Sequence, residues 1–225
     1  LRLCSARSIQ RFDLHSFNEG IYDKAMADQT FAEAISKVLY PSDDHMQGKQ
    51  LRLKQFYFLS SATMQSMLKR HKQIFSDLHT LPDHVVIQIN ETHPALAIPE
   101  LMRILMDEEG FGWDEAYQIV KKMFHYTNHT IMTEAMEYWD ENMFRFLLPR
   151  IYQIVCAFNE KYCNKIRAYY SHDEEKVRSM AIIGNNEIRM ANLCVAVCRR
   201  VNGVSNLHGD ILKEKIFNSS YRIFP

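Results

Sequence analysis

The chain has 225 residues, 47% of them hydrophobic, so it can bury the core of one large domain or two small ones. Its 27 Lys and Arg residues balance 27 Asp and Glu residues, and this neutral balance gives no basic surface for nucleic acid. No apolar run approaches the roughly 18 residues of a membrane-spanning helix, and no secretory signal is present, so we expect no membrane partner.

The first third of the chain predicts two helices. Residues 17–38 place apolar side chains at helical spacing, and this helix ends before a turn-forming acidic loop, Ser42-Asp43-Asp44-His45. Residues 49–75 predict either one long helix or a broken pair. This segment ends in the basic cluster at residues 69–72, which complements the dipole at a helix C-terminus; an anion site is the alternative.

The chain is organised around residues 85–105. The β-branched apolar run at 85–89 predicts a buried strand, which ends in the polar corner Asn90-Glu91-Thr92-His93. Pro94 and Pro99 are expected to keep the next residues out of regular helix before a helical pattern resumes. A carboxylate and an imidazole therefore lie at the carboxyl end of a strand, where open α/β sheets bind ligands.

The next segment predicts a helix, a strand and a further helix. Residues 113–123 predict a helix with acidic residues in its first turn. Residues 124–128 predict a second short strand, which delivers Asn128 and His129 to another polar corner. Glu134 follows, at the expected start of a helix that bears Met136 and Trp139.

The last third predicts three helices and a hairpin. Pro149 opens a long helix with an apolar face, and Gly184-Asn185-Asn186 separates two apolar runs as a hairpin turn. Residues 190–197 predict a buried helix. Residues 201–204 predict a tight turn with Gly203 at positive φ, and a final helix follows over 206–217.

The five cysteines favour reduced thiols in a cytosol. They are odd in number and include no Cys-x-x-Cys pair, and a chain of this size needs no disulfide staples. Cys194 and Cys198 lie four residues apart, but no second pair completes a zinc set, so we interpret them as buried apolar residues. No His-Glu-x-x-His, P-loop or nucleophile elbow is present, and no metal site is predicted.

Three polar corners remain as candidate sites: residues 90–93, residues 128–134 and residues 202–208. Each contains a His and an Asn, and such groups suit a sugar because its hydroxyls need donors and acceptors in fixed directions. A carboxylate beside a glucosyl ring also supports an oxocarbenium-like transition state. A single His near apolar residues is more often a hydrogen-bonded core residue, so one corner alone indicates little.

Several strings in these corners resemble the signatures of the α-glucan phosphorylases, the family of the glycogen, starch and maltodextrin phosphorylases. The likeness covers essentially the whole chain, with the strings in the family's order. They are Asn90-Glu91-Thr92-His93-Pro94 followed by Ala97-Ile98-Pro99-Glu100-Leu101, Tyr126-Thr127-Asn128-His129-Thr130 with Glu134-Ala135, and Met190-Ala191-Asn192-Leu193-Cys194 leading into Val201-Asn202-Gly203-Val204 and Leu207-His208.

The resemblance implies an α/β fold: a helix-rich portion of a Rossmann-like, GT-B type N-terminal domain with an incomplete sheet. Residues 1–225 are then part of that domain, as the apolar chain ends also suggest. The family's pyridoxal phosphate lysine, in a Gly-Thr-Ser-Asn-Met-Lys setting, belongs to a C-terminal domain that this sequence lacks. We therefore expect pyridoxal phosphate in the parent enzyme, no cofactor on this chain and no activity from the chain alone.

The implied activity is phosphorolysis of an α-1,4-glucan at its non-reducing end, with glucose 1-phosphate as the product. The implied partners are glucan or maltodextrin and phosphate, and the parent is expected to be a cytoplasmic homodimer. The basic cluster at 69–72 contains a position, Arg70, that animal enzymes use for regulation. However, the connection from His71 to Pro82 is short, which favours a bacterial type with little nucleotide control.

The resemblance also assigns roles residue by residue. His129 binds the glucosyl unit at the catalytic site, with Glu91 and His93 beside it, and Glu91 stands where the family usually has Asp. Glu134 is expected to support that wall by hydrogen bonding. The other implied substrate-binding residues are Asn128, Val204 and His208 near the sugar, and Asp43, Asp44 and His45 in a mobile gate loop.

Two readings from other classes stay open at this point. The first is a non-catalytic helical domain that binds glucan or another protein. The second is a glycoside hydrolase, which needs two acids flanking one bond, with Glu91 and Glu134 as candidates.

Overall fold

The computed structural model describes residues 4–171 and 173–224, which fall into two compact units. The division lies after Ala62, inside the long helix α3 (Met46–Ile74). The predicted segment 49–75 is thus one unbroken helix of 29 residues rather than a broken pair.

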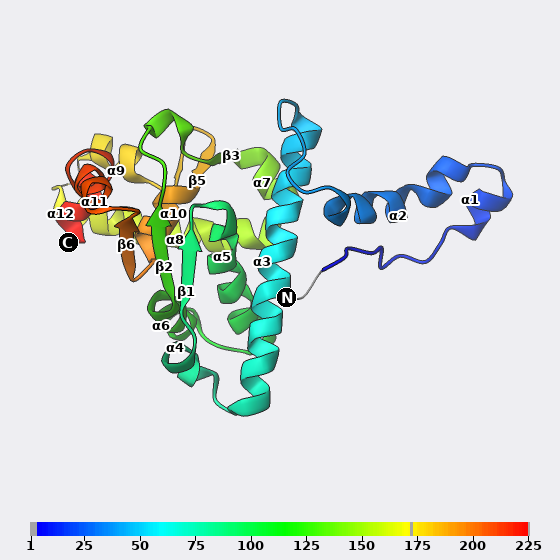
Figure 1. Ribbon diagram of the computed structural model, residues 1–225, viewed down its shortest axis with the longest axis horizontal. Helices are drawn as coiled ribbons and strands as arrows, with labels where there is room; N and C mark the ends of the chain where they lie inside the picture. The colour runs from blue at the N-terminus through cyan, green and yellow to red at the C-terminus, as the bar shows by residue number, and fades with distance from the viewer. Residues whose placement is uncertain (1–3, 172, 225) are drawn as a thin grey trace. The chain divides into compact units, whose positions relative to one another are not determined.

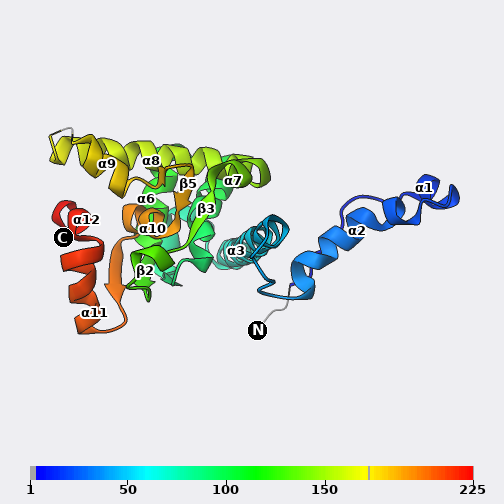
Figure 2. The same ribbon diagram turned by 90° about the horizontal axis from the view of Figure 1, so that it is seen from above.

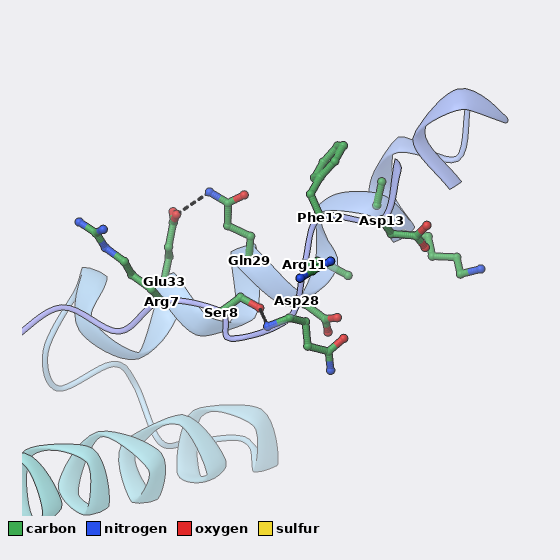
Figure 3. Close-up of a pocket in the computed structure, with 12 residues that line it drawn as sticks. Arg7, Ser8, Arg11, Phe12, Asp13, Asp28, Gln29 and Glu33 are labelled. Atoms are coloured by element: carbon green, nitrogen blue, oxygen red, sulfur yellow. Dashed lines mark hydrogen bonds between the residues drawn. The ribbon is translucent and has the colours of Figure 1, made fainter. Parts of the chain in front are cut away.

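The first unit is built from helices and an extended N-terminal segment. The predicted helix over 17–38 is two helices, α1 (Leu14–Asn18) and α2 (Tyr22–Lys37), because Gly20 takes a φ of +81° between them. Ala6 N–H donates to Ser36 Oγ (2.9 Å) and ties the segment to α2. Figure 3 shows the open, mixed-charge groove between them, where Arg7 and Arg11 lie near Asp28 and Glu33.

The second unit contains a three-stranded parallel sheet in the order β1 (Ile87–Asn90), β2 (Phe124–Asn128) and β6 (Arg200–Gly203) (Figure 1). The predicted strand 124–128 is confirmed. The prediction of a buried strand at 85–89 is wrong in part, since β1 begins at Ile87 and Val86 is 66% exposed while Ile89 is buried. Among the described strands β1 pairs only with β2, so it forms one edge of this sheet.

Helices cover the parallel sheet and supply most of its core. The helices α6 (Trp113–Met123) and α10 (Met190–Val197) begin and end close to where the sequence predicts them, and the long helix α8 (Pro149–Tyr169) begins at Pro149 as predicted. Figure 2 shows α10 between β2 and α8, and it contacts both. The apolar face of α8 is buried as predicted, including Ile154, Val155 and Phe158.

A second, antiparallel sheet has the order β3 (Tyr138–Asp140), β5 (Glu187–Arg189) and β4 (Ile183–Gly184). Asn185 and Asn186, with φ of 58° and 61°, form the two-residue turn that the sequence predicts. The helix expected from Glu134 is wrong: Thr133–Ala135 is a 3₁₀ turn, and Trp139 lies in β3. The apolar spacing there serves pairing with β5, about fifty residues later, rather than a helix face.

Two further expectations are corrected. Residues 201–204 do not form a turn with Gly203 at positive φ; they belong largely to strand β6, which pairs with β2. Pro99 does not delay the following helix, since it lies in the first turn of α5 (Ala97–Arg103), where a missing N–H is tolerated.

The remaining helices are mostly short and connect these layers. They are α4 (Leu81–His84), α7 (Glu141–Leu147), α9 (Glu174–Met180), α11 (Asn206–Ile211), which continues as a wider turn over Leu212–Ile216, and α12 (Asn218–Ile223). The final helix expected over 206–217 is thus confirmed in position. Within the described residues, no helix is both long enough and apolar enough to cross a bilayer.

Candidate functional site

The carboxyl ends of the three parallel strands bring the polar corners together. In the strand register, Asn90 pairs with Thr127 and Asn128 pairs with Gly203, so all three strands end at one edge. Glu91, His129 and Val204 directly follow the three strands in the chain, so they lie at this same edge of the sheet. Ligands bind at this edge in open α/β sheets.

Glu91 joins the first two corners. The Glu91 backbone has a φ of 62°, which is unusual for a residue other than Gly, Asn or Asp. The Glu91 N–H donates to Thr127 O (3.0 Å). The Glu91 carboxylate accepts from His129 N–H (2.9 Å), and the His129 ring bonds through Nε2 to Asn90 Oδ1. His129 is thus held by both its backbone and its ring while its side chain stays exposed.

A second group of contacts joins the other two corners. Asn128 is fully buried; its Nδ2 donates to the Tyr126 hydroxyl (2.9 Å), and its Oδ1 bonds to His208 Nε2 (3.2 Å). Val204 N–H, just after β6, donates to His208 Nδ1 (3.4 Å). The third corner therefore meets the second through a buried side-chain network.

His93 lies close to this edge along the chain. It begins the 3₁₀ turn His93–Leu96, two residues after Glu91, and is half-buried. Its neighbour Thr92 is buried and donates from Oγ1 to Glu137 Oε2 (2.7 Å). Glu137 was missed by the sequence analysis, although it is a carboxylate only three residues beyond the selected Glu134.

Glu134 lies apart from these contacts. Its side chain is exposed and lines a depression together with Met180, Asn192 and Ser220. The expected hydrogen-bonding support from Glu134 stays a prediction, while the bond from this segment to the first corner is made by Glu137.

The three predicted gate-loop residues lie in the first unit and are bonded locally. Asp43 pairs with Arg52 of α3 (2.6 Å), and Asp44 accepts from the Ser42 hydroxyl (2.7 Å). His45 precedes α3, and its Nδ1 accepts from Gly48 N–H (3.0 Å) in the manner of a helix N-cap. The loop therefore also organises the start of α3.

The electrostatics of the parallel sheet favour neutral groups behind the edge. Burial raises the pKa of the Tyr126 phenol well above its ordinary value, so this hydroxyl stays protonated. Burial, with Arg199 and Arg200 nearby, lowers the pKa of His125 on the same strand. In the part of the chain that the structure describes, no group of three or more His, Cys, Asp or Glu side chains could hold a metal ion.

Comparison with known proteins gives one consistent result. The sequence profile described as carbohydrate phosphorylase matches residues 1–225. The chain is 44% identical to the brain form of glycogen phosphorylase from Bos taurus, 43% to the brain form from Homo sapiens and 41% to the muscle form from Ovis aries. Each alignment covers 100% of this chain but 28% of the relative, so the chain spans about a quarter of the relatives' length.

Proposed function

The chain belongs to the carbohydrate phosphorylase family, and we propose that it is part of an α-1,4-glucan phosphorylase. Such an enzyme is a hexosyltransferase that uses inorganic phosphate to release glucose 1-phosphate from the non-reducing end of a glucan. The match over the whole chain, to glycogen phosphorylases in particular, is the observation that carries this proposal. The polar contacts at the carboxyl edge of the parallel sheet support it.

In this proposal His129 contacts the glucosyl unit, with Glu91 and His93 beside it. The bonds from Asn90 and Glu91 fix the His129 ring and backbone before substrate arrives, which lowers the entropic cost of orientation. An exposed imidazole and a carboxylate also offer both a donor and an acceptor to sugar hydroxyls. The Glu91 carboxylate is bonded to the His129 N–H and so lies beside the bound sugar in this proposal. Its negative charge then stabilises positive charge that develops on the sugar.

We infer that the chain forms part of a GT-B type N-terminal domain in a cytoplasmic, homodimeric enzyme, as the resemblance implies. The bacterial type with little nucleotide control stays a prediction. The family's pyridoxal phosphate needs a lysine for its covalent anchor. None of the residues that follow the three parallel strands, Asn90 to His93, Asn128 to Thr130 and Val204 to His208, is a lysine, so these residues do not fit that role.

The direct test measures the products that the full-length protein forms from maltodextrin and inorganic phosphate. We expect glucose 1-phosphate in amounts that depend on phosphate. Glucose formed without any need for phosphate would indicate a hydrolase instead. Maltodextrin binding without either product would indicate a non-catalytic glucan-binding domain.

A further inference from the structure

Four polar groups form a continuous chain behind the carboxyl edge, buried except at its Val204 end. They are the Tyr126 hydroxyl, the Asn128 amide, the His208 imidazole and the Val204 N–H. Tyr126 and Asn128 are fully buried, and His208 is 6% exposed. A buried amide or imidazole must find its partners inside the protein, so the direction of each bond matters.

The Val204 N–H sets the direction of the whole chain, because a backbone N–H can only donate. His208 Nδ1 must then be the acceptor, so the ring hydrogen lies on Nε2 and donates to Asn128 Oδ1. The Asn128 Nδ2 in turn donates to the Tyr126 hydroxyl. The network therefore holds His208 as the neutral Nε2–H tautomer.

Asn128 is out of reach of a substrate. Its side chain is buried, and both ends of its amide are bonded within the protein. Removing the Tyr126 hydroxyl would leave the Asn128 Nδ2 without this buried partner. The amide would then gain by turning toward other partners, and its bond to His208 would weaken.

The backbone at the end of β6 rests directly on His208. A Cβ added to Gly203 would lie 2.9 Å from His208 Cγ and 2.8 Å from Gly209 N. Ser205 Oγ also accepts from His208 N–H (3.2 Å), which fixes the start of α11. Because the contact is this close, a change in the position of the His208 ring displaces the backbone of Gly203 and Val204.

We propose that Tyr126 and Asn128 are positioning residues, which hold His208 in one tautomer so that it fixes the Val204 backbone at the sugar-binding edge. This rests on the proposed function for its catalytic consequence. Tyr126 is fully buried in β2 and contacts no substrate. Asn128 moves from the expected substrate-binding residues to this supporting role.

The test uses the full-length enzyme with Tyr126→Phe. We expect kcat for maltodextrin phosphorolysis to fall about tenfold to a hundredfold with KM little changed, because displaced backbone at the reacting centre costs most in the transition state. Tyr162→Phe is the matched control, since that tyrosine is 3% exposed and bonds to buried Ser220 Oγ (3.0 Å) in α12. We expect the control to lose similar stability but to keep kcat.

Two further readouts separate positioning from simple structural support. In protein labelled with ¹⁵N-histidine, and with the His208 signals assigned by their loss in His208→Gln, His208 should show an unprotonated Nδ1 and a protonated Nε2. The signals should change in Tyr126→Phe and not in Tyr162→Phe. His208→Gln should recover much of the kcat lost in His208→Ala, because an amide also offers one acceptor and one donor.

The opposite results overturn the proposal. They are a protonated Nδ1 in the unmodified protein, or equal kcat losses in Tyr126→Phe and Tyr162→Phe. If the unmodified protein forms no glucose 1-phosphate, the proposed function fails. The histidine spectrum then still decides whether the tautomer is held as stated.

Discussion

The two small sheets of the second unit differ in how they use their polar residues. The parallel sheet joins strands from three distant segments and ends in side chains that bond across strands, as Glu91 does with His129. The antiparallel sheet contains a local hairpin, and its Arg189 donates to the carbonyl oxygens of Arg178 and Ser179 (3.0 and 3.2 Å). The parallel sheet thus leaves the His129 imidazole exposed at its edge. In the antiparallel sheet the Arg189 guanidinium is instead bonded to neighbouring backbone.

This difference suggests a division of roles within one unit. Changes to the exposed side chains at the parallel edge should affect activity more than stability, and changes in the antiparallel sheet should do the reverse. The predictions below test that division, beginning with the largest expected effect.

His129→Ala in the full-length enzyme should reduce kcat/KM for maltodextrin by about a hundredfold or more, because in the proposed function this side chain contacts the reacting sugar. Thermal stability should change little, since the side chain is exposed. His79→Ala is the matched control, an exposed histidine bonded to Asp77 (2.7 Å) and Glu115 (2.6 Å). Near-normal turnover in His129→Ala would remove this residue from the site.

Gly203→Ala should destabilise the end of β6 by about 1–3 kcal/mol, because the new methyl group would press on His208 and Gly209. Amide hydrogen exchange of residues 200–204 measures this local change. Gly209→Ala is the control, since nothing lies within 4 Å of the added Cβ and the residue is in α11. Equal effects from the two variants would contradict the close contact.

Asn186→Ala should destabilise the hairpin by about 1 kcal/mol, because φ is 61° there and alanine avoids this region. Asn186→Gly accepts the same backbone conformation and serves as the control. Hydrogen exchange of residues 183–189 should report the loss in Asn186→Ala alone. Phosphorolysis per folded molecule should stay unchanged, and a large loss of activity would break the proposed division of roles.

The smallest effect is expected at His79, whose pKa is raised by its hydrogen bonds to Glu115 and then Asp77. Its contribution to stability is fully present below the ordinary histidine pKa of 6.5 and is lost as pH rises through the raised value. It also fades at low pH, because the lowered pKa values of Asp77 and Glu115 are then passed. The difference in Tm between the unmodified protein and His79→Gln should therefore peak in mild acid. A difference that grows toward alkaline pH would contradict this sign.

Elements with local signals could be predicted from the sequence. The helix α8 follows Pro149 and an apolar face, and the β4–β5 turn follows from Asn185-Asn186. The failures involve distant pairing: Trp139 meets Ile188 across two strands, and residues 200–203 pair with β2 from about 75 residues earlier. The spacing of apolar residues within a segment does not indicate which distant strand the segment pairs with. The sequence therefore predicts a helix where β3 forms and a turn where β6 forms.

The candidate site shows the same limit. The sequence selects Glu91, His129 and His208 because unusual polar groups interrupt apolar elements. It does not select Tyr126, because a tyrosine in a buried strand looks like ordinary core and its partner Asn128 gives no local sign of the bond. The role of Glu134 stays a prediction, although this residue lies in a 3₁₀ turn rather than at the start of a helix.

The most direct test of the central claim is hydrogen–deuterium exchange of the full-length protein with and without saturating maltodextrin. If the carboxyl edge of the parallel sheet binds the sugar, peptides covering residues 87–93 and 124–130 should exchange more slowly with maltodextrin. The hairpin at residues 183–189 should not change. Protection confined to the hairpin, with the edge unaffected, would contradict the account.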